Sequence, residues 1–467
     1  MSRRSKLGRL LALCASALLI TAAAAAESPP PVGPPRPFTL PSSRDIRLGN
    51  GFVATLVASG TVPKVTVALV LRAGNIDDAA QTGLADVAAN LLKEGAGRYD
   101  AAQLARLAAD MGGALEVAAG PDQTTLSMDV LSERATDAIA LLADIVRRPH
   151  LPAGELARLK ADLGRQTAIA RSQPQGLAGD AFARLLWGEH PYGRVLPTDA
   201  GIASITIDSV RTFIANNYGA GRAHLFIAGL FDAAAAERAI QQQFANWATG
   251  RPLTAPQATG SRARIVMLID RPGAAQSTVL LGLPVPPPVT PGFMRLSIAN
   301  ALLGGSLLSR LNQNLREDKG WTYGVRTQIT PYAGGAATWA LSADINAPDT
   351  APAIAEIFTE LGRMRTAAPP AEELRGTQNY RAGTFVIGAS GRAGLIAQLA
   401  FADLQGLSQD WLTNYGAHVY AVTPNDVREA AASYLDPNAM TMVVVGDMTK
   451  LKAAIVALPA LHGATFQ

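Results

Sequence analysis

Apolar residues recur along this chain with two spacings, one typical of strands and one typical of helices. Alternating positions in Lys64–Arg72 predict a half-buried strand, and apolar residues on one helical face predict a helix over Thr82–Glu94 that Gly95 ends. Further elements are expected in this half of the chain: strands over 114–119 and 124–131 joined through Gly120-Pro121, helices from 133 to about 187 with breaks near 149–152 and at Pro174, a strand over 223–228, and a helix to about 247.

The same order of elements restarts after residues 251–262, a Pro- and Gly-containing segment that is typical of a linker. Strands are expected over 265–270 and 277–283, followed by a Pro-rich turn over 284–291, then helices, two strands and more helices. Because strands cluster early in each half and helices follow in runs, the pattern favours an α+β fold over a doubly wound parallel sheet.

An internal repeat supports two homologous lobes. At an offset of 217 residues, Thr206-x3-Val210-Arg211 matches Thr423-x3-Val427-Arg428. Eighteen residues after each arginine a predicted strand ends in glycine, Gly229 or Gly446. We therefore expect a first lobe over residues 45–250 and a second over 263–467.

The N-terminal region predicts export. Residues 1–26 have four basic residues, then an apolar run, then Ala24-Ala25-Ala26, which is the pattern of a secretory signal peptide. Residues 27–44 form a Pro-rich lead-in. The only cysteine, Cys14, lies within the signal, so no thiol is expected in the mature chain, which fits a bacterial periplasm. No later apolar run is long enough to span a membrane.

Removal of the signal also changes the charge. Four of 41 basic residues leave, and the remaining 37 equal the 37 acidic ones. A neutral chain of this kind gives no support for a nucleic-acid partner.

The segment 83–92, Gly-Leu-Ala-Asp-Val-Ala-Ala-Asn-Leu-Leu, resembles the zinc helix of the pitrilysin/insulinase/mitochondrial processing peptidase family, which carries His-x-x-Glu-His in this frame. The histidine positions are Asp86 and Asn90, and the glutamate position is Ala89. The stretch 156–171, where the family places its third ligand, a glutamate, contains only Asp162 as an acid. No two of the five histidines are spaced four apart. The sequence therefore predicts no zinc in this chain, and Asp86 with Asn90 form either a weak hard-cation site or a solvated helix face.

Three further segments carry the resemblance: His190-Pro191-Tyr192-Gly193, the strand Val443–Gly446 with Asp447, and Ser309-Arg310-Leu311-x3-Leu315-Arg316-x3-Gly320-x2-Tyr323. The last is similar to the family's second-lobe signature, which implies that Arg316 and Tyr323 serve an active site by binding a substrate carbonyl and an oxyanion. His190 is interpreted as a residue that caps or packs a turn. Gly304-Gly305 is interpreted as an anion cradle, a point of close approach for a peptide, or a tight turn.

The resemblance implies two α+β lobes in a clam-shell arrangement, each with a mostly antiparallel sheet and helices packed on one face. Three functions follow as alternatives. The first is the non-zinc subunit of an exported heteromeric peptidase, whose similar-sized partner carries zinc on His-x-x-Glu-His while this chain contributes Arg316 and Tyr323 and binds peptide by strand addition. The second is a stand-alone, inactive peptide-binding protein acting as a carrier or chaperone. The third is a structural scaffold.

Overall fold

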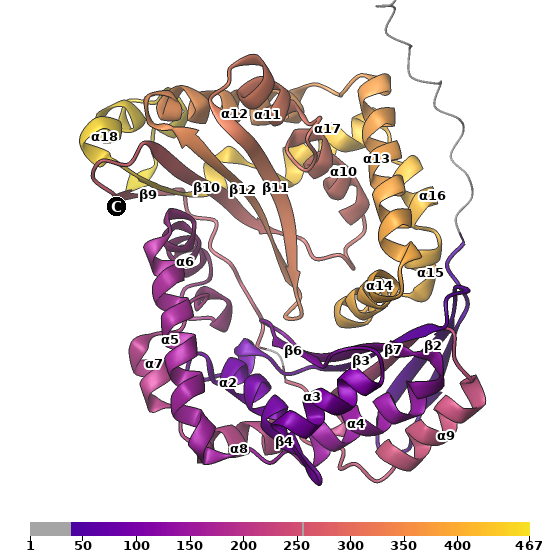
Figure 1. The fold of residues 1–467 in the computed structure, drawn as a ribbon. Coiled ribbons are helices and arrows are strands. Elements are labelled where there is room, and N and C mark those ends of the chain that lie inside the picture. Colours follow the sequence, from indigo (N-terminus) through magenta and orange to yellow (C-terminus); the bar gives the residue numbers. More distant parts are fainter. Residues whose placement is uncertain (1–38, 255) are drawn as a thin grey trace, which may run out of the picture. The chain divides into compact units, whose positions relative to one another are not determined.

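The computed structural model describes residues 39–254 and 256–467. The expected signal peptide, Cys14 and most of the Pro-rich lead-in lie outside these residues. The first lobe contains a six-stranded sheet in the order β1-β2-β8-β3-β7-β6 (Figure 1). Its strands are β1 (Ser43–Arg47), β2 (Val53–Ala58), β3 (Lys64–Leu71), β6 (Glu116–Ala119), β7 (Thr124–Leu131) and β8 (Ala223–Gly229), and β4 (Gly95–Ala96) pairs separately with β5 (Tyr99–Asp100).

The second lobe contains a sheet in the order β11-β12-β10-β13-β9-β14. Its strands are β9 (Ile265–Asp270), β10 (Gln276–Val285), β11 (Thr322–Tyr332), β12 (Ala336–Asn346), β13 (Thr441–Gly446) and β14 (Thr465–Phe466). Strands β2-β8-β3-β7-β6 correspond to β9-β13-β10-β12-β11 in order. In each set the first two strands, β2 with β8 and β9 with β13, pair in parallel. The next strands, β3 and β10, pair with β8 and β13 in antiparallel orientation. The predicted α+β fold with two homologous lobes is confirmed.

The helices also occur in two corresponding runs. The first lobe has α2 (Leu84–Leu91), α3 (Ala101–Asp110), α4 (Ala135–Arg147), α5 (Leu156–Ser172), α6 (Pro174–Trp187), α7 (Asp199–Ser204), α8 (Ile207–Asn217) and α9 (Ala233–Phe244). The second has α10 (Phe293–Leu303), α11 (Arg310–Asn312), the π-helical turn η7 (Gln313–Asp318), α12 (Thr350–Thr366), α13 (Ala371–Ser390), α14 (Arg392–Gln405), α15 (Gln409–Thr413), α16 (Tyr415–Tyr420), α17 (Pro424–Tyr434) and α18 (Met448–Val456).

The sequence repeat marks equivalent helix starts. Thr206 and Thr423 are the N-cap residues of α8 and α17, and each accepts a hydrogen bond from the third residue of its helix in a capping box. Val210 and Val427 are fully buried on those helices. The repeat is therefore structural, because the matching residues cap and pack matching helices.

One helix of each lobe packs on the sheet of the other lobe. On β3, alternate residues such as Val67 and Leu69 face the first lobe's own core, whereas Ala68 and Val70 contact Leu395 and its neighbours on α14. In the same way α6 packs against β13 and β10 of the second lobe, through the apolar side chains Phe182, Leu186, Val443 and Val445. Each sheet is thus covered by helices of its own lobe on one face and by a single exchanged helix on the other.

Two sequence expectations concern particular segments. The Pro-rich turn begins later than expected, because Pro284 and Val285 belong to β10. Pro284 lies in the part of β10 that pairs with β12 alone, beyond the pairing with β13 that ends at Gly282. A missing N–H is tolerated best there.

Among the described residues, no single helix is long and apolar enough to cross a membrane. The pair α13–α14 passes that test by combined length and composition, with a bend of 111°.

Candidate functional site

The helix that carries the altered zinc motif is fixed by a buried carboxylate. Asp78 accepts hydrogen bonds from the backbone N–H groups of Gly83 and Ala85, at 2.8 and 2.7 Å, and so caps the start of α2. Burial raises the pKa of Asp78 to about 6, although these hydrogen bonds oppose the shift. Gly83 has a φ of +91°, and a Cβ there would lie 2.7 Å from the Leu163 side chain on α5. The glycine lets α2 approach α5 closely.

The three motif positions have lost the chemistry of a metal site. Asp86 is partly buried and accepts a hydrogen bond from Asn75 at 2.7 Å, and burial raises the pKa of its carboxyl. Ala89 is buried and has no group that transfers a proton. The side-chain amide of Asn90 donates to the backbone carbonyl of Asp86 at 2.9 Å, one turn back. Asp86 and Asn90 are therefore partly exposed residues of one helix whose side chains make hydrogen bonds within the protein.

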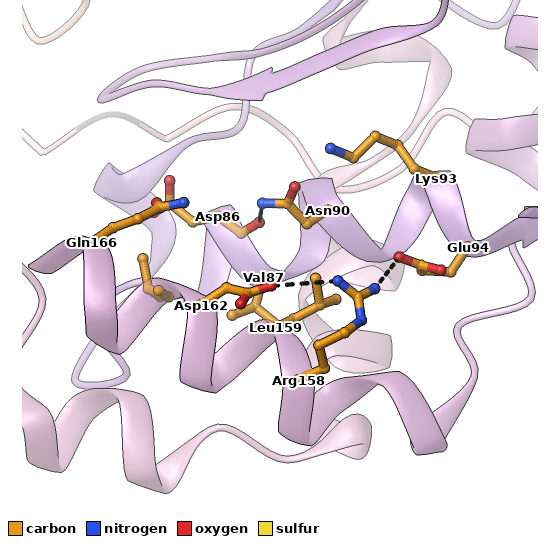
Figure 2. Close-up of a pocket in the computed structure, with 10 residues that line it drawn as sticks. Asp86, Val87, Asn90, Lys93, Glu94, Arg158, Leu159, Asp162 and Gln166 are labelled. Carbon is orange, nitrogen blue, oxygen red and sulfur yellow. Dashed lines mark hydrogen bonds and ion pairs between the residues drawn. The ribbon is translucent and has the colours of Figure 1, made fainter. Parts of the chain in front are cut away.

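Asp86 and Asn90 line a pocket of about 270 Å³ between α2 and α5 (Figure 2). Arg158 on α5 binds Glu94 at 2.6 Å and Glu155 at 2.7 Å, and these hydrogen bonds raise the pKa of its guanidinium. Asp162, the acid noted in the sequence, is held by Arg158 at 3.4 Å and by Arg165. Figure 2 shows that Gln166, one turn further along α5, extends toward Asp86. Gln166, which was not predicted as a site residue, therefore faces the motif.

The side chains that line this pocket do not fit the ligand set of a zinc site. A catalytic zinc site needs three protein ligands, usually including imidazoles. The lining residues include no histidine or cysteine, and Lys93 and Arg158 bring positive charge into the pocket. Within residues 39–254 and 256–467, no group of three His, Cys, Asp or Glu side chains is placed to hold a metal ion.

The second-lobe signature folds into a short helical turn and the start of an edge strand. Arg316 lies on η7, is partly exposed, and makes an ion pair of 3.4 Å with its neighbour Glu317. Gly320, with a φ of +67°, lies between this turn and β11. Tyr323 is 91% exposed and lies where the pairing of β11 with β12 shifts register between Thr322 and Val325. In the described part of the chain, the phenol of Tyr323 has no hydrogen-bond partner, and no hydrogen bond joins it to Arg316.

A buried asparagine that was not predicted from the sequence holds this region in place. Asn312 is 2% exposed, and its amide donates to the carbonyls of Ser306 and Val325, each at 2.8 Å. Its oxygen accepts from the N–H of Val325 at 2.8 Å. Thr322 donates to the carbonyl of Asp344 on β12 at 2.6 Å. The bulge that presents Tyr323 is therefore anchored on both sides, and a polar residue within the signature was the signal that could have revealed it.

The remaining predicted residues have structural contacts. Gly304 and Gly305 follow the C-terminus of α10, so neither lies at a helix N-terminus where an anion would bind. A Cβ on Gly304 would lie 2.5 Å from Thr327, and one on Gly305 would lie 2.8 Å from Ala301, so both glycines allow the chain to pack on itself. The ring of His190 accepts a hydrogen bond from the N–H of Tyr192 at 3.2 Å, which confirms its predicted role as a turn cap.

Comparison with known proteins identifies the family. Residues 53–199 match the family described as insulinase (peptidase family M16), and residues 204–380 match the peptidase M16 inactive domain. The two matches are adjacent and together span most of both lobes. The chain belongs to the pitrilysin/insulinase family of peptidases.

Individual relatives agree with this assignment. An uncharacterized zinc protease of Mycobacterium leprae is 25% identical over 281 residues, which cover 59% of this chain and 63% of the relative. One of Streptomyces coelicolor is 22% identical over 391 residues, or 81% of this chain and 85% of the relative. A peptidase M16 inactive domain from Pseudomonas fluorescens superposes with a TM-score of 0.81 at 23% identity, over 86% of this chain and 98% of that structure. A protease from Helicobacter pylori gives 0.80 at 16%, over 87% and 100%. At these identities the structures support the fold alone.

Proposed function

We propose that this chain is the non-zinc subunit of an exported, heteromeric peptidase, active in the bacterial periplasm. In this proposal a similar-sized partner of the same family supplies the zinc site, and this chain contributes Arg316 and Tyr323 and binds peptide. Family membership supports a role in proteolysis, and the pocket at Asp86 and Asn90, whose side chains do not fit zinc, supports the absence of catalysis by this chain alone. The signal peptide predicted over residues 1–26 supports the compartment.

The exposure of Tyr323 on a fixed backbone is the observation that carries the proposal. A tyrosine with a buried ring usually forms a hydrogen bond through its hydroxyl, whereas Tyr323 is 91% exposed and its phenol has no partner among the described residues. The backbone beneath it is nevertheless fixed through Asn312 and Thr322. A fixed backbone that presents a free phenol is suited to donating a hydrogen bond to a group outside the chain, such as a developing oxyanion.

Peptide binding by strand addition is compatible with the described sheets. The strands β6 and β11 each pair with a single neighbour among the described residues, so each offers one unpaired edge. An extended peptide that adds to an edge is held through its backbone, which gives sequence-tolerant recognition. Binding of this kind suits a peptidase subunit that accepts many sequences.

The role of Tyr323 is tested with Tyr323→Phe in the isolated complex. Loss of one oxyanion donor lowers kcat by about two to three orders of magnitude. Assembly, measured by analytical ultracentrifugation, should be unchanged. The matched control is Tyr380→Phe, since Tyr380 is also exposed but lies on α13 outside the signature. Equal turnover by Tyr323→Phe and wild type would refute the catalytic contribution.

The heteromeric state is tested by affinity purification of the tagged chain from its own host, with zinc quantified in the product. A similar-sized partner bearing His-x-x-Glu-His, and one zinc per pair, is the expected result. A chain that purifies alone, without metal, and binds unfolded peptide would instead establish the stand-alone peptide-binding protein.

A further inference from the structure

The second lobe contains a pocket of about 550 Å³ that is separate from the altered zinc motif. It lies among α10, β11, α13, α14, α15 and α16. Its volume is within the range of small-molecule sites. One of its lining residues, Arg381 on α13, is charged, and the others are neutral. Those that the argument uses are Gln328, Thr384, Gln398, Phe401, Trp411 and Tyr415.

The guanidinium of Arg381 has no acidic partner in the described chain. Its Nη2 donates to the hydroxyls of Ser297 at 3.2 Å and Tyr415 at 3.1 Å. Its Nε is buried without an acceptor, and its Nη1 makes no hydrogen bond within the described residues. By contrast, Arg310 places two N–H groups on the Glu373 carboxylate, each at 2.7 Å. A partly buried cation without a counter-charge favours binding of an anion.

Aromatic side chains form one wall of the pocket beside Arg381. Tyr415 stacks on Phe385 with ring centroids 4.1 Å apart, and Trp411 meets Tyr415 edge to face at 5.5 Å. Phe401 contacts Trp411 at 6.4 Å. Because Tyr415 belongs to this wall and also accepts from Arg381, the aromatic surface and the positive charge are adjacent.

We infer that this pocket binds a carboxylate that carries an aromatic or aliphatic group, and that its occupant is the C-terminal residue of a peptide. The carboxylate pairs with Arg381, and the side chain packs on Trp411 and Phe401. The choice of a peptide rests on the proposed peptide-binding function, whereas the carboxylate recognition rests on the pocket alone.

A carboxylate fits this pocket better than a phosphate group. A phosphate carries up to two charges and is usually held by several cationic or backbone N–H donors. Here one guanidinium faces a neutral surface with an aromatic wall, which matches a single negative charge with an apolar substituent. The amide of Gln398 and the side-chain oxygen of Gln328, whose nitrogen donates to Thr330 at 3.2 Å, can orient the adjoining peptide group.

The inference is tested by calorimetric titration of the full chain, without partner or metal. The probes are N-acetyl-phenylalanine, its amide, and a hexapeptide ending in phenylalanine with either a free or an amidated C-terminus. Loss of one charge-assisted hydrogen bond predicts about 10- to 100-fold weaker binding of each amidated probe. Tighter binding of the free hexapeptide than of the blocked amino acid identifies a peptide terminus. Equal binding of both acids identifies a small carboxylic acid and overturns the choice of a peptide.

Variants separate recognition from folding. Arg381→Gln should lose the preference for the free carboxylate, whereas Arg375→Gln, the same change on an exposed residue of α13, should keep it. Thr384→Trp, at an exposed position that lines the pocket, should block binding even if Arg381→Gln fails to fold. Equal affinity for acid and amide, no binding at millimolar concentration, or unchanged binding by both pocket variants would overturn the inference. These results do not depend on Tyr323 or on a partner, so the two proposals can fail separately.

Discussion

Arg392, the first residue of α14, donates hydrogen bonds from Nε and Nη2 to the carboxylate of Asp129 on β7, at distances of 2.9 to 3.1 Å. The sheet of the other lobe has the equivalent contact, in which an amide replaces the guanidinium. Gln175, near the start of α6, donates to Asp344 on β12 at 3.0 Å. In both cases a threonine of the neighbouring strand, Thr66 or Thr278, donates to the same aspartate. The internal repeat therefore includes the polar contacts that hold each exchanged helix on the opposite sheet.

A second polar contact of α14 makes stability depend on pH. Asp403 binds Arg72 at 2.7 Å and the ring of His224 at 3.2 Å, which joins α14 to the first lobe. Burial alone raises the pKa of Asp403, but hydrogen bonds and charges from His224 and Arg72 outweigh it and lower the pKa to about 2. Because the folded pKa lies below the ordinary 3.8, the stabilisation is present above pH 3.8 and is lost as the pH falls toward 2.

We therefore expect Asp403→Asn to cost about 1–2 kcal/mol at neutral pH, after allowing for partial exposure. Urea unfolding of wild type and variant between about pH 7 and about pH 3 measures the effect. The difference in unfolding free energy should shrink toward acid. Asp410→Asn, an exposed residue on α15, is the control and should show little difference at any pH. A difference for Asp403→Asn that does not change with pH would contradict the assignment.

Sequence periodicity was sufficient for the order of elements and for the two-lobe fold, because alternation and helical spacing report local burial. Thr206 and Thr423 could be matched because an N-cap threonine has a local role. The exchange of α6 and α14 could not be predicted, since apolar residues such as Phe182 and Leu395 show that a face is buried but not which sheet covers it.

The residues of the candidate site were also predictable only where their role depends on the local sequence. Asp86, Ala89 and Asn90 were found because the motif is contiguous, and the structure places them on one helix as expected. Gln166 was missed because its position opposite Asp86 depends on how α5 packs against α2. Asn312 was missed because its importance comes from contacts with Ser306 and Val325 that only the folded loop brings together.

Asn312 should be important for stability as well as for positioning Tyr323. Asn312→Ala leaves the N–H of Val325 and two carbonyls without their partner in a buried site. We expect a loss of about 2–3 kcal/mol in the free energy of unfolding. Asn414→Ala, which removes an exposed asparagine, should cost less than about 0.5 kcal/mol. Chemical denaturation measures both, and equal small losses would show that the Asn312 contacts are dispensable.

Two glycines near the altered motif should respond oppositely to alanine. Gly83→Ala places a Cβ at a φ of +91° and 2.7 Å from Leu163, so we expect it to destabilise the protein by about 1–3 kcal/mol. Gly164→Ala, within α5, meets no atom within 4 Å and should stabilise the protein by up to about 1 kcal/mol. Thermal unfolding of both variants compares them directly. A stabilising Gly83→Ala would show that α2 and α5 can separate at low cost.

The arrangement of α2 and α5 also predicts how zinc binding can be restored. Asp86→His and Asn90→His create two imidazole ligands one turn apart, and a third ligand must come from α5. Gln166 faces Asp86, whereas Asp162 is held by Arg158 and Arg165. We therefore expect Asp86→His/Asn90→His/Gln166→Glu to bind one zinc per chain at least about tenfold more tightly than the matched triple variant with Asp162→Glu. Competition with a chromophoric chelator measures both affinities, with the unaltered chain as the blank. Tighter binding by the Asp162→Glu combination would show that Arg158 and Arg165 release that side chain readily and that Gln166 is not the position equivalent to the third ligand.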